Sequence, residues 1–280
     1  RDDIPQPTTA AIAIRWFDST LSKAIVELDD LFSKYRLSEA LMVVYRLFWE
    51  EFSSWYLEIV KPAYRQPIDN KTYDATLAFF DALLRLLHPF MPFITEELWQ
   101  ALSDRKQDDS IMIARLPESR PFDEALLTDF EKVKEIIAGI RTIRLQKKIP
   151  NKEKLSLQFT GDYGNTYDSV IIKMGNLTSI ENVQKKKPGS VGFLVGTTEF
   201  SIPLSDKTNV ETELKKLNAE LEYQKGFLKS VMKKLNNERF VQNAKPEIVE
   251  NERKKKADAE SKIALLKENI AALEKTNLKK

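Results

Sequence analysis

The sequence predicts a mainly α-helical protein in three parts. They are a helical bundle in residues 1–122, a long helix with a small α/β unit in 123–206, and an antiparallel coiled-coil hairpin in 207–280. Apolar side chains recur at helical spacing through most of the first part, and they recur at alternating steps of four and three through the last. Between these parts, short stretches alternate apolar and polar residues, as half-buried strands do.

The most apolar stretch of the first part is 83–102, LLRLLHPFMPFITEELWQAL. His88 precedes Pro89 and is therefore pushed out of the α region, which ends one helix, while Pro92 suits the first turn of the next. Two apolar helices joined at such an elbow need partner helices to cover them. The expected bundle helices are 8–35, 38–61, 72–88 and 94–103.

The second part begins with a long helix, which we expect from Asp123 or Glu124 to Lys148, since Pro150 stops it. LSLQFTG (155–161) alternates like a strand. A short helix is expected at 166–174, further short strands at 181–184, 192–196 and 199–204, and a charged turn at KKKPGS (185–190).

The third part carries a heptad seam that a polar, proline-containing bend interrupts. Two helices of about 27 residues, at about 1.5 Å per residue, would form an arm of about 40 Å. The seam positions are Val210, Leu214, Leu217, Leu221, Gln224, Leu228, Val231 and Leu235, then Ala259, Ile263, Leu266, Ile270 and Leu273.

Composition narrows the class of protein. The 280 residues include no cysteine and one histidine, which excludes disulfides and multi-histidine metal sites, so we expect no metal site. No apolar run is long enough for a membrane span and no secretory signal is visible, so a cytoplasmic location is expected. The net charge of +2 hides an asymmetry, because 207–280 holds 18 basic and 12 acidic residues. A basic tail favours a polyanionic partner, although it is also typical of a solvated helical face.

No catalytic constellation is apparent, and we expect no catalytic residue in this chain. His88 has no serine, cysteine or second histidine in a nucleophile pattern and is expected to be a packed structural residue. The adjacent pairs Glu50-Glu51 and Glu96-Glu97 point about 100° apart on a helix and do not converge. No glycine-rich phosphate-binding motif occurs, and no cofactor is expected here.

Two basic regions are candidates for binding phosphates. Arg141, Arg144 and Lys148 are spaced i, i+3 and i+7, which predicts one basic helical face, although a plain exposed face fits equally well. In the hairpin, positive charge gathers around the bend, and Phe240 among those cations is suited to stacking on an unpaired base. The hairpin candidates are Lys229, Lys233, Lys234, Arg239, Phe240, Lys245, Arg253, Lys254, Lys255 and Lys256.

Two segments of the bundle resemble a known family. FWEEFSSWYLEIVKP (48–62) and LLRLLHPFMPFITEELWQ (83–100) resemble the anticodon-binding bundle of class I aminoacyl-tRNA synthetases of the valine, isoleucine and leucine group. GIRTIRLQKKIP (139–150) is similar to the segment after that bundle. KLNNERFVQNAKPEIVENERKKKADAESKIALL (234–266) resembles the C-terminal coiled-coil arm of the valyl-tRNA synthetases in particular.

The resemblance implies that the first part is an anticodon-binding bundle and the third a tRNA-binding arm. The parent enzyme would ligate valine to its tRNA using ATP. The partner would be a valine-specific tRNA and the protein a monomer. The family signatures His-x-Gly-His and Lys-Met-Ser-Lys-Ser are absent, so adenylate chemistry and ATP use would lie outside this sequence. The alternative is a non-enzymatic coiled-coil module that binds a partner helix.

Overall fold

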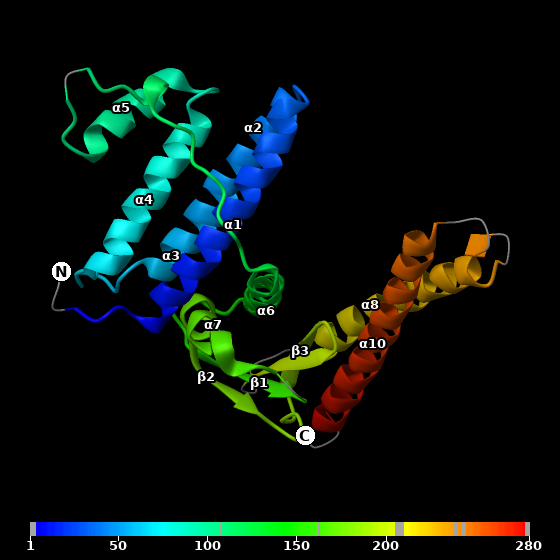
Figure 1. Cartoon of the computed structure of the whole chain (residues 1–280). Coiled ribbons are helices and arrows are strands. Elements are labelled where there is room, and N and C mark those ends of the chain that lie inside the picture. Colours follow the sequence, from blue (N-terminus) through cyan, green and yellow to red (C-terminus); the bar gives the residue numbers. More distant parts are fainter. Residues whose placement is uncertain are drawn as a thin grey trace. The chain divides into compact units, whose positions relative to one another are not determined.

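The computed structural model describes residues 4–106, 108–161, 163–204, 210–237, 240–241 and 245–277, apart from the side chains of 210–213 and 275–277. The chain forms two compact units, Arg1–Glu131 and Lys132–Lys280 (Figure 1). Their boundary lies inside helix α6 (Glu124–Lys147). The three-part division at 122 and 206 stays a prediction.

The first unit is a helical bundle, as the apolar spacing predicts. Its α-helices are α1 (Thr8–Ser33), α2 (Leu37–Arg46), α3 (Leu57–Val60), α4 (Asn70–Leu87) and α5 (Pro92–Leu102). The core is aromatic, because the ring of Phe17 lies 5.2 Å from that of Tyr56 and 4.9 Å from that of Phe79. Edge-to-face and offset rings at such distances add to the apolar area that they bury.

The predicted helix 38–61 is not a regular α-helix, since Leu47–Tyr56 (η1) is a π-helix between α2 and α3. Bonding from i to i+5 widens the turn, so residues spaced by four lie nearly in a row. Phe52 stacks on Tyr56 at 5.4 Å with an interplanar angle of 15° in this way. The Ser53 hydroxyl donates to the carbonyl oxygen of Phe48, five residues back, at 2.9 Å. Sequence periodicity alone does not distinguish this widened turn from an α-helix.

The elbow between α4 and α5 lies where it is predicted, but His88 keeps an α conformation (φ −53°, ψ −40°), so the expectation that Pro89 pushes it out of the α region is wrong. α4 ends at Leu87, before His88-Pro89, and Pro92 occupies the first position of α5. His88 Nδ1 lies 2.7 Å from the hydroxyl of Thr95, which is itself fully buried. The histidine therefore joins the two helices, which fits the structural role expected for it.

The second unit contains a four-stranded sheet in the order β2-β1-β4-β3. Its elements are α6, β1 (Leu155–Thr160), the 3₁₀ turn η3 (Asn165–Tyr167), α7 (Asp168–Gly175), β2 (Leu177–Asn182), β3 (Ser190–Val195) and β4 (Thr198–Pro203). β1 and β2 are parallel, joined across α7, and the other pairs are antiparallel. The strand expected at 181–184 starts earlier than predicted, because Asn176 adopts a left-handed conformation that ends α7.

Gly139 allows α6 to approach the sheet closely. A Cβ atom at this position would lie 2.3 Å from ring atoms of Phe193 on β3, which no real Cβ tolerates. A helical glycine is unfavourable by about 1 kcal/mol relative to alanine. Close packing against the aromatic ring offsets that penalty.

The heptad pattern is confirmed as a helical hairpin of α8 (Val210–Leu235) and α10 (Pro246–Asn277), which lie side by side in Figure 1. Leu221, Ile263 and Ile270 are buried at the seam. Leu214, Leu217, Leu228 and Leu266 pack against them. The apolar stripe of each helix is thus covered by the other helix of the same chain.

Candidate nucleic-acid interface

Predicted cations from α8 and α10 lie on both sides of the bend. Because the helices are antiparallel, the last turns of α8 and the first turns of α10 share one end of the hairpin, here called the tip (residues 229–256). Four lysines of the tip are exposed and make no ion pair with any residue that the structure describes. They are Lys229, Lys233, Lys245 and Lys254. Their charges are available to an anionic partner.

The other predicted cations of the tip are ion-paired within the hairpin. Glu252 is buried in the seam with 7% of its side chain exposed, and its carboxylate lies 2.8 Å from Lys255 Nζ and 3.5 Å from Lys234 Nζ. The hydrogen bond from Lys255, followed by the charge of Lys234, lowers the pKa of Glu252 despite its burial. Arg253 and Lys256 make long, exposed pairs at 3.7 and 3.8 Å with Glu250 and Glu260. Such surface pairs are weak and exchange readily for a phosphate.

A hollow of about 480 Å³ lies beside the bend. Leu235, Val241 and Val249 supply its apolar floor. Arg253, Lys256 and the acidic Glu260 also line it, and Lys256 lies 3.8 Å from Glu260. An apolar floor near the exposed lysines of the tip suits an unstacked base whose phosphates stay in water. Sequence periodicity alone does not reveal this floor, since its residues occupy seam or bend positions.

Phe240 is half-buried rather than fully exposed as expected. Its backbone N–H donates to the side-chain oxygen of Asn237 at 3.3 Å, which holds the chain at the end of α8. The residue is thus only partly exposed for the stacking expected of it. Arg239 lies outside the described residues.

The prediction of one basic face at Arg141, Arg144 and Lys148 is wrong for two of the three residues. α6 ends at Lys147, and Lys148 lies beyond it with a positive φ of 53°. Arg144 is only 5% exposed, and burial lowers the pKa of its guanidinium. It donates to four backbone carbonyls at 2.8–3.1 Å, those of Pro150, Glu153, Gly175 and Asn176. Arg144 therefore holds the chain after α6 in place, because both of its terminal nitrogens donate to the backbone and not to a phosphate.

The exposed Arg141 and Lys148 nevertheless flank one hollow of about 650 Å³ at the end of α6. Leu145, which is 81% exposed, and Met174 add apolar surface to it. The arrangement repeats that of the tip: two cations beside an apolar surface. Periodicity does not reveal it, because Met174 of α7 and Asn176, the residue that follows α7, are more than 25 residues away along the chain.

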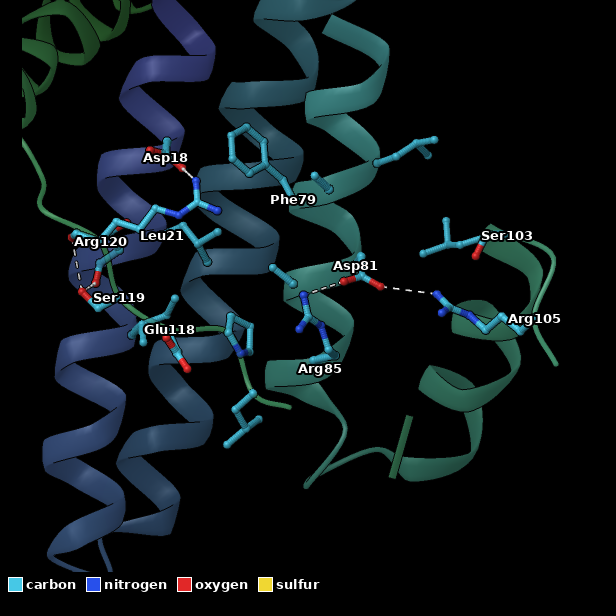
Figure 2. Close-up of a pocket in the computed structure, with 18 residues that line it drawn as sticks. Asp18, Leu21, Phe79, Asp81, Arg85, Ser103, Arg105, Glu118, Ser119 and Arg120 are labelled. Carbon is cyan, nitrogen blue, oxygen red and sulfur yellow. Dashed lines mark hydrogen bonds and ion pairs between the residues drawn. The ribbon is translucent and has the colours of Figure 1, made fainter. Parts of the chain in front are cut away.

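A hollow of about 690 Å³ in the first unit lies among α1, α4 and residues 116–120 (Figure 2). Asp18 pairs with Arg120 at 3.6 Å. Asp81 pairs with Arg85 at 2.6 Å and with Arg105 at 3.5 Å. These opposite charges neutralise one another, so this hollow does not share the positive character of the tip.

Within the described part of the chain, no group of three or more potential metal ligands occurs. No helix there is long and apolar enough to cross a bilayer. The glutamate pairs do not converge on a shared site; Glu96 instead accepts from the Ser110 hydroxyl at 2.7 Å and from the Ile111 N–H at 3.2 Å. These bonds lower its pKa, the one from Ser110 most, and bind the loop to α5.

Comparison with known proteins yields two family matches. Residues 14–159 match the model described as the anticodon-binding domain of tRNA ligase. Residues 209–274 match the model described as the valyl tRNA synthetase tRNA binding arm. The first match covers more than half of the chain, and the second covers the helical hairpin.

Curated relatives match along nearly the whole chain. Proteins named valine–tRNA ligase from Parabacteroides distasonis and Phocaeicola vulgatus are 62% and 60% identical over 274 residues, or 98% of this chain. One from Porphyromonas gingivalis is 55% identical over 271 residues, or 97% of the chain. In each case the match covers 31% of the relative, so the chain spans about a third of the length of these relatives.

Proposed function

The chain belongs to the family of anticodon-binding domains of tRNA ligases, and from that premise we propose that it binds tRNA. It would do so as part of a valine–tRNA ligase, an enzyme that joins valine to its tRNA with ATP. The bundle would lie against the anticodon stem and loop. The arm would reach the outer corner, where the D and T loops meet. The described side chains would bind and orient the RNA and would leave the ligation chemistry to other parts of such an enzyme.

The observation that supports this proposal most strongly is the distribution of charge on the arm. Lys229, Lys233, Lys245 and Lys254 are exposed at the tip beside a hollow with an apolar floor. Each phosphate that a lysine neutralises releases counterions and adds salt-dependent affinity. The apolar floor offers a surface to an unpaired base, which is the part of a folded RNA that proteins read most readily.

Arg141 and Lys148 supply a second, smaller contact surface in the same unit. Both are exposed beside the hollow at the end of α6. We expect them to contact backbone phosphates, which position RNA without reading its sequence.

The alternative, a module whose coiled coil binds a partner helix, has less support. Leu221, Ile263 and Ile270 are buried within the hairpin, so its apolar seam is already covered. We expect the chain to be a monomer. Gel filtration checks this, because a free seam would make the chain self-associate whether or not tRNA is present.

The test is fluorescence anisotropy with the 280-residue chain, comparing labelled valine tRNA with the tRNA of an unrelated amino acid at one fixed salt concentration. We expect both to bind and the valine tRNA to bind more tightly. Equal affinities would contradict the valine specificity. No binding to either RNA at low salt would contradict the proposed function itself.

A further inference from the structure

Lys186, in the turn before β3, is largely buried although the lysines on either side of it are exposed. KKKPGS was expected to be a charged turn, and Lys185 and Lys187 are exposed as such a turn requires. Lys186 between them has only 9% of its side chain exposed. A lysine is seldom buried to this extent unless its charge is paired.

The ammonium of Lys186 joins the sheet to the arm. Its Nζ lies 2.8 Å from a carboxylate oxygen of Glu199 on β4, and it donates to the side-chain oxygen of Asn269 on α10 at 2.5 Å. Asn269 is itself 7% exposed, and α10 lies against β3 at this place. The buried ammonium of Lys186 thus bonds to Glu199 and Asn269, two side chains that are 70 residues apart in the sequence.

Gly192 on β3 makes room for this contact. A Cβ atom there would lie 2.8 Å from Lys186 Nζ and 3.0 Å from Glu199 Oε1. Any side chain at this position would therefore displace the ammonium group. We call Lys186, Glu199 and Asn269 the clamp. The clamp depends on Gly192, because a residue with a side chain would not fit beside it.

We propose that Lys186 is a positioning residue that fixes the direction of the arm relative to the sheet, and so sets where the tip meets tRNA. This inference rests on the proposed function. From Asn269 to Lys254 is 15 helical residues, or about 22 Å at 1.5 Å per residue. A rotation of about 10° at the clamp would move the tip by about 4 Å, which is more than the whole length of a charge-assisted hydrogen bond, about 2.8 Å.

A single ammonium group suits this role better than apolar packing does. Apolar packing is non-directional, whereas a buried charge is stable only with its partners in place. If the arm points in another direction, Lys186 loses a partner and leaves an uncompensated buried charge. Other directions of the arm are therefore higher in free energy. The clamp thereby selects one direction without contacting the RNA.

The direction of the arm is measured by spin-label distances, for which a cysteine-free chain is well suited. Labels at Lys154→Cys, just before β1, and at Asp258→Cys on α10 report sheet-to-arm distance; both positions are exposed. We expect one narrow distance distribution in the parent and a broad or shifted one after Lys186→Ala. Lys185→Ala and Lys187→Ala remove the same charge from the same turn and should leave the distribution narrow.

Two further variants keep the test decisive if Lys186→Ala perturbs folding. Gly192→Ala retains every member of the clamp but displaces the ammonium, so it should broaden the distribution as well. Lys186→Glu combined with Glu199→Lys reverses the ion pair, and the amide of Asn269 can donate where it formerly accepted. The reversed pair should restore a narrow distribution at unchanged net charge, which a general loss of stability would not do.

The same variants are then titrated with valine tRNA. We expect Lys186→Ala and Gly192→Ala to weaken binding about tenfold, because an unfixed arm lowers the effective concentration of the tip at the RNA. The controls and the reversed pair should bind like the parent. If the parent binds tRNA and Lys186→Ala changes neither the distances nor the affinity, the inference is wrong; if the parent does not bind tRNA, the proposed function fails first.

Discussion

Lys234 Nζ lies 3.5 Å from a carboxylate oxygen of Glu252, which joins the end of α8 to the start of α10 beside the bend. The carboxylate also pairs with Lys255 of its own helix at 2.8 Å. A polar group at a seam position specifies the register of a coiled coil. The two arms of the hairpin are therefore held in register at the end that carries the exposed lysines.

Glu252→Gln should destabilise the arm by about 1 kcal/mol, the range of ion pairs whose partners are exposed. Because the folded-state pKa of Glu252 is lowered, first by Lys255, its contribution is present above the unfolded value of about 4.3 and is lost as pH falls through the folded value. Circular-dichroism melts between pH 3 and 7 should show less acid destabilisation in Glu252→Gln than in the parent. An unchanged acid dependence would contradict this assignment.

Arg144→Ala should destabilise the second unit by about 3 kcal/mol, because it deprives four backbone carbonyls of a charged donor. Arg144→Lys should be nearly as harmful, since one ammonium cannot reproduce the guanidinium fork. Arg141→Ala is the matched control on the same helix. It should leave the free energy of unfolding within about 0.5 kcal/mol and weaken tRNA binding instead. The opposite pattern would show that the two arginines have been assigned the wrong roles.

Tyr56 should make stability fall at alkaline pH. Burial raises the pKa of its hydroxyl to about 12, while the hydroxyl lies 2.8 Å from that of Thr76. The folded state holds this proton more tightly than the unfolded chain, so the stabilisation is present below about pH 10 and is lost as pH rises toward 12. Urea unfolding at pH 8 to 11.5 should show a smaller alkaline loss in Tyr56→Phe. Burial also raises the pKa of Tyr163, so Tyr163→Phe should likewise reduce the alkaline loss of stability.

Gly139→Ala should destabilise the second unit by about 1–3 kcal/mol, as overpacking does, although alanine is the better helix former. The added Cβ would lie 2.3 Å from the ring of Phe193. In a double-mutant cycle, Phe193→Ala should remove most of that penalty. Additive effects of the two changes would contradict the close contact between α6 and β3.

The sequence predicted the helical elements well, because the spacing of apolar residues and the positions of prolines determine where such helices run and end. His88-Pro89 and Pro92 marked the elbow between α4 and α5, and the heptad steps marked the hairpin. The π-helix was missed, since its row of aromatic residues spaced by four also fits an α-helix. The left-handed conformation of Asn176 was not predicted either, and because of it β2 begins at Leu177, earlier than the strand expected at 181–184.

The candidate interface was predicted only in part. Charge counting located the cations of the tip, but it could not show that Lys234 and Lys255 are paired with a buried glutamate while Lys233 and Lys254 are not. Helical spacing likewise placed Arg144 on an exposed face. The carbonyls that it binds lie up to 32 residues further along the chain, and local patterns do not reveal such contacts.

The most direct test of the central claim, that the tip of the arm binds tRNA phosphates, is the dependence of affinity on salt in two charge-matched variants. One replaces the exposed tip lysines Lys229, Lys233 and Lys254 with alanine, and the other replaces the exposed Lys215, Lys262 and Lys267, away from the tip. We expect the tip variant to bind valine tRNA more weakly, with a salt slope reduced by about two, since each lost phosphate contact removes about 0.7–0.9. The second variant should keep the slope of the parent. Equal slopes in the parent and the tip variant would contradict the claim.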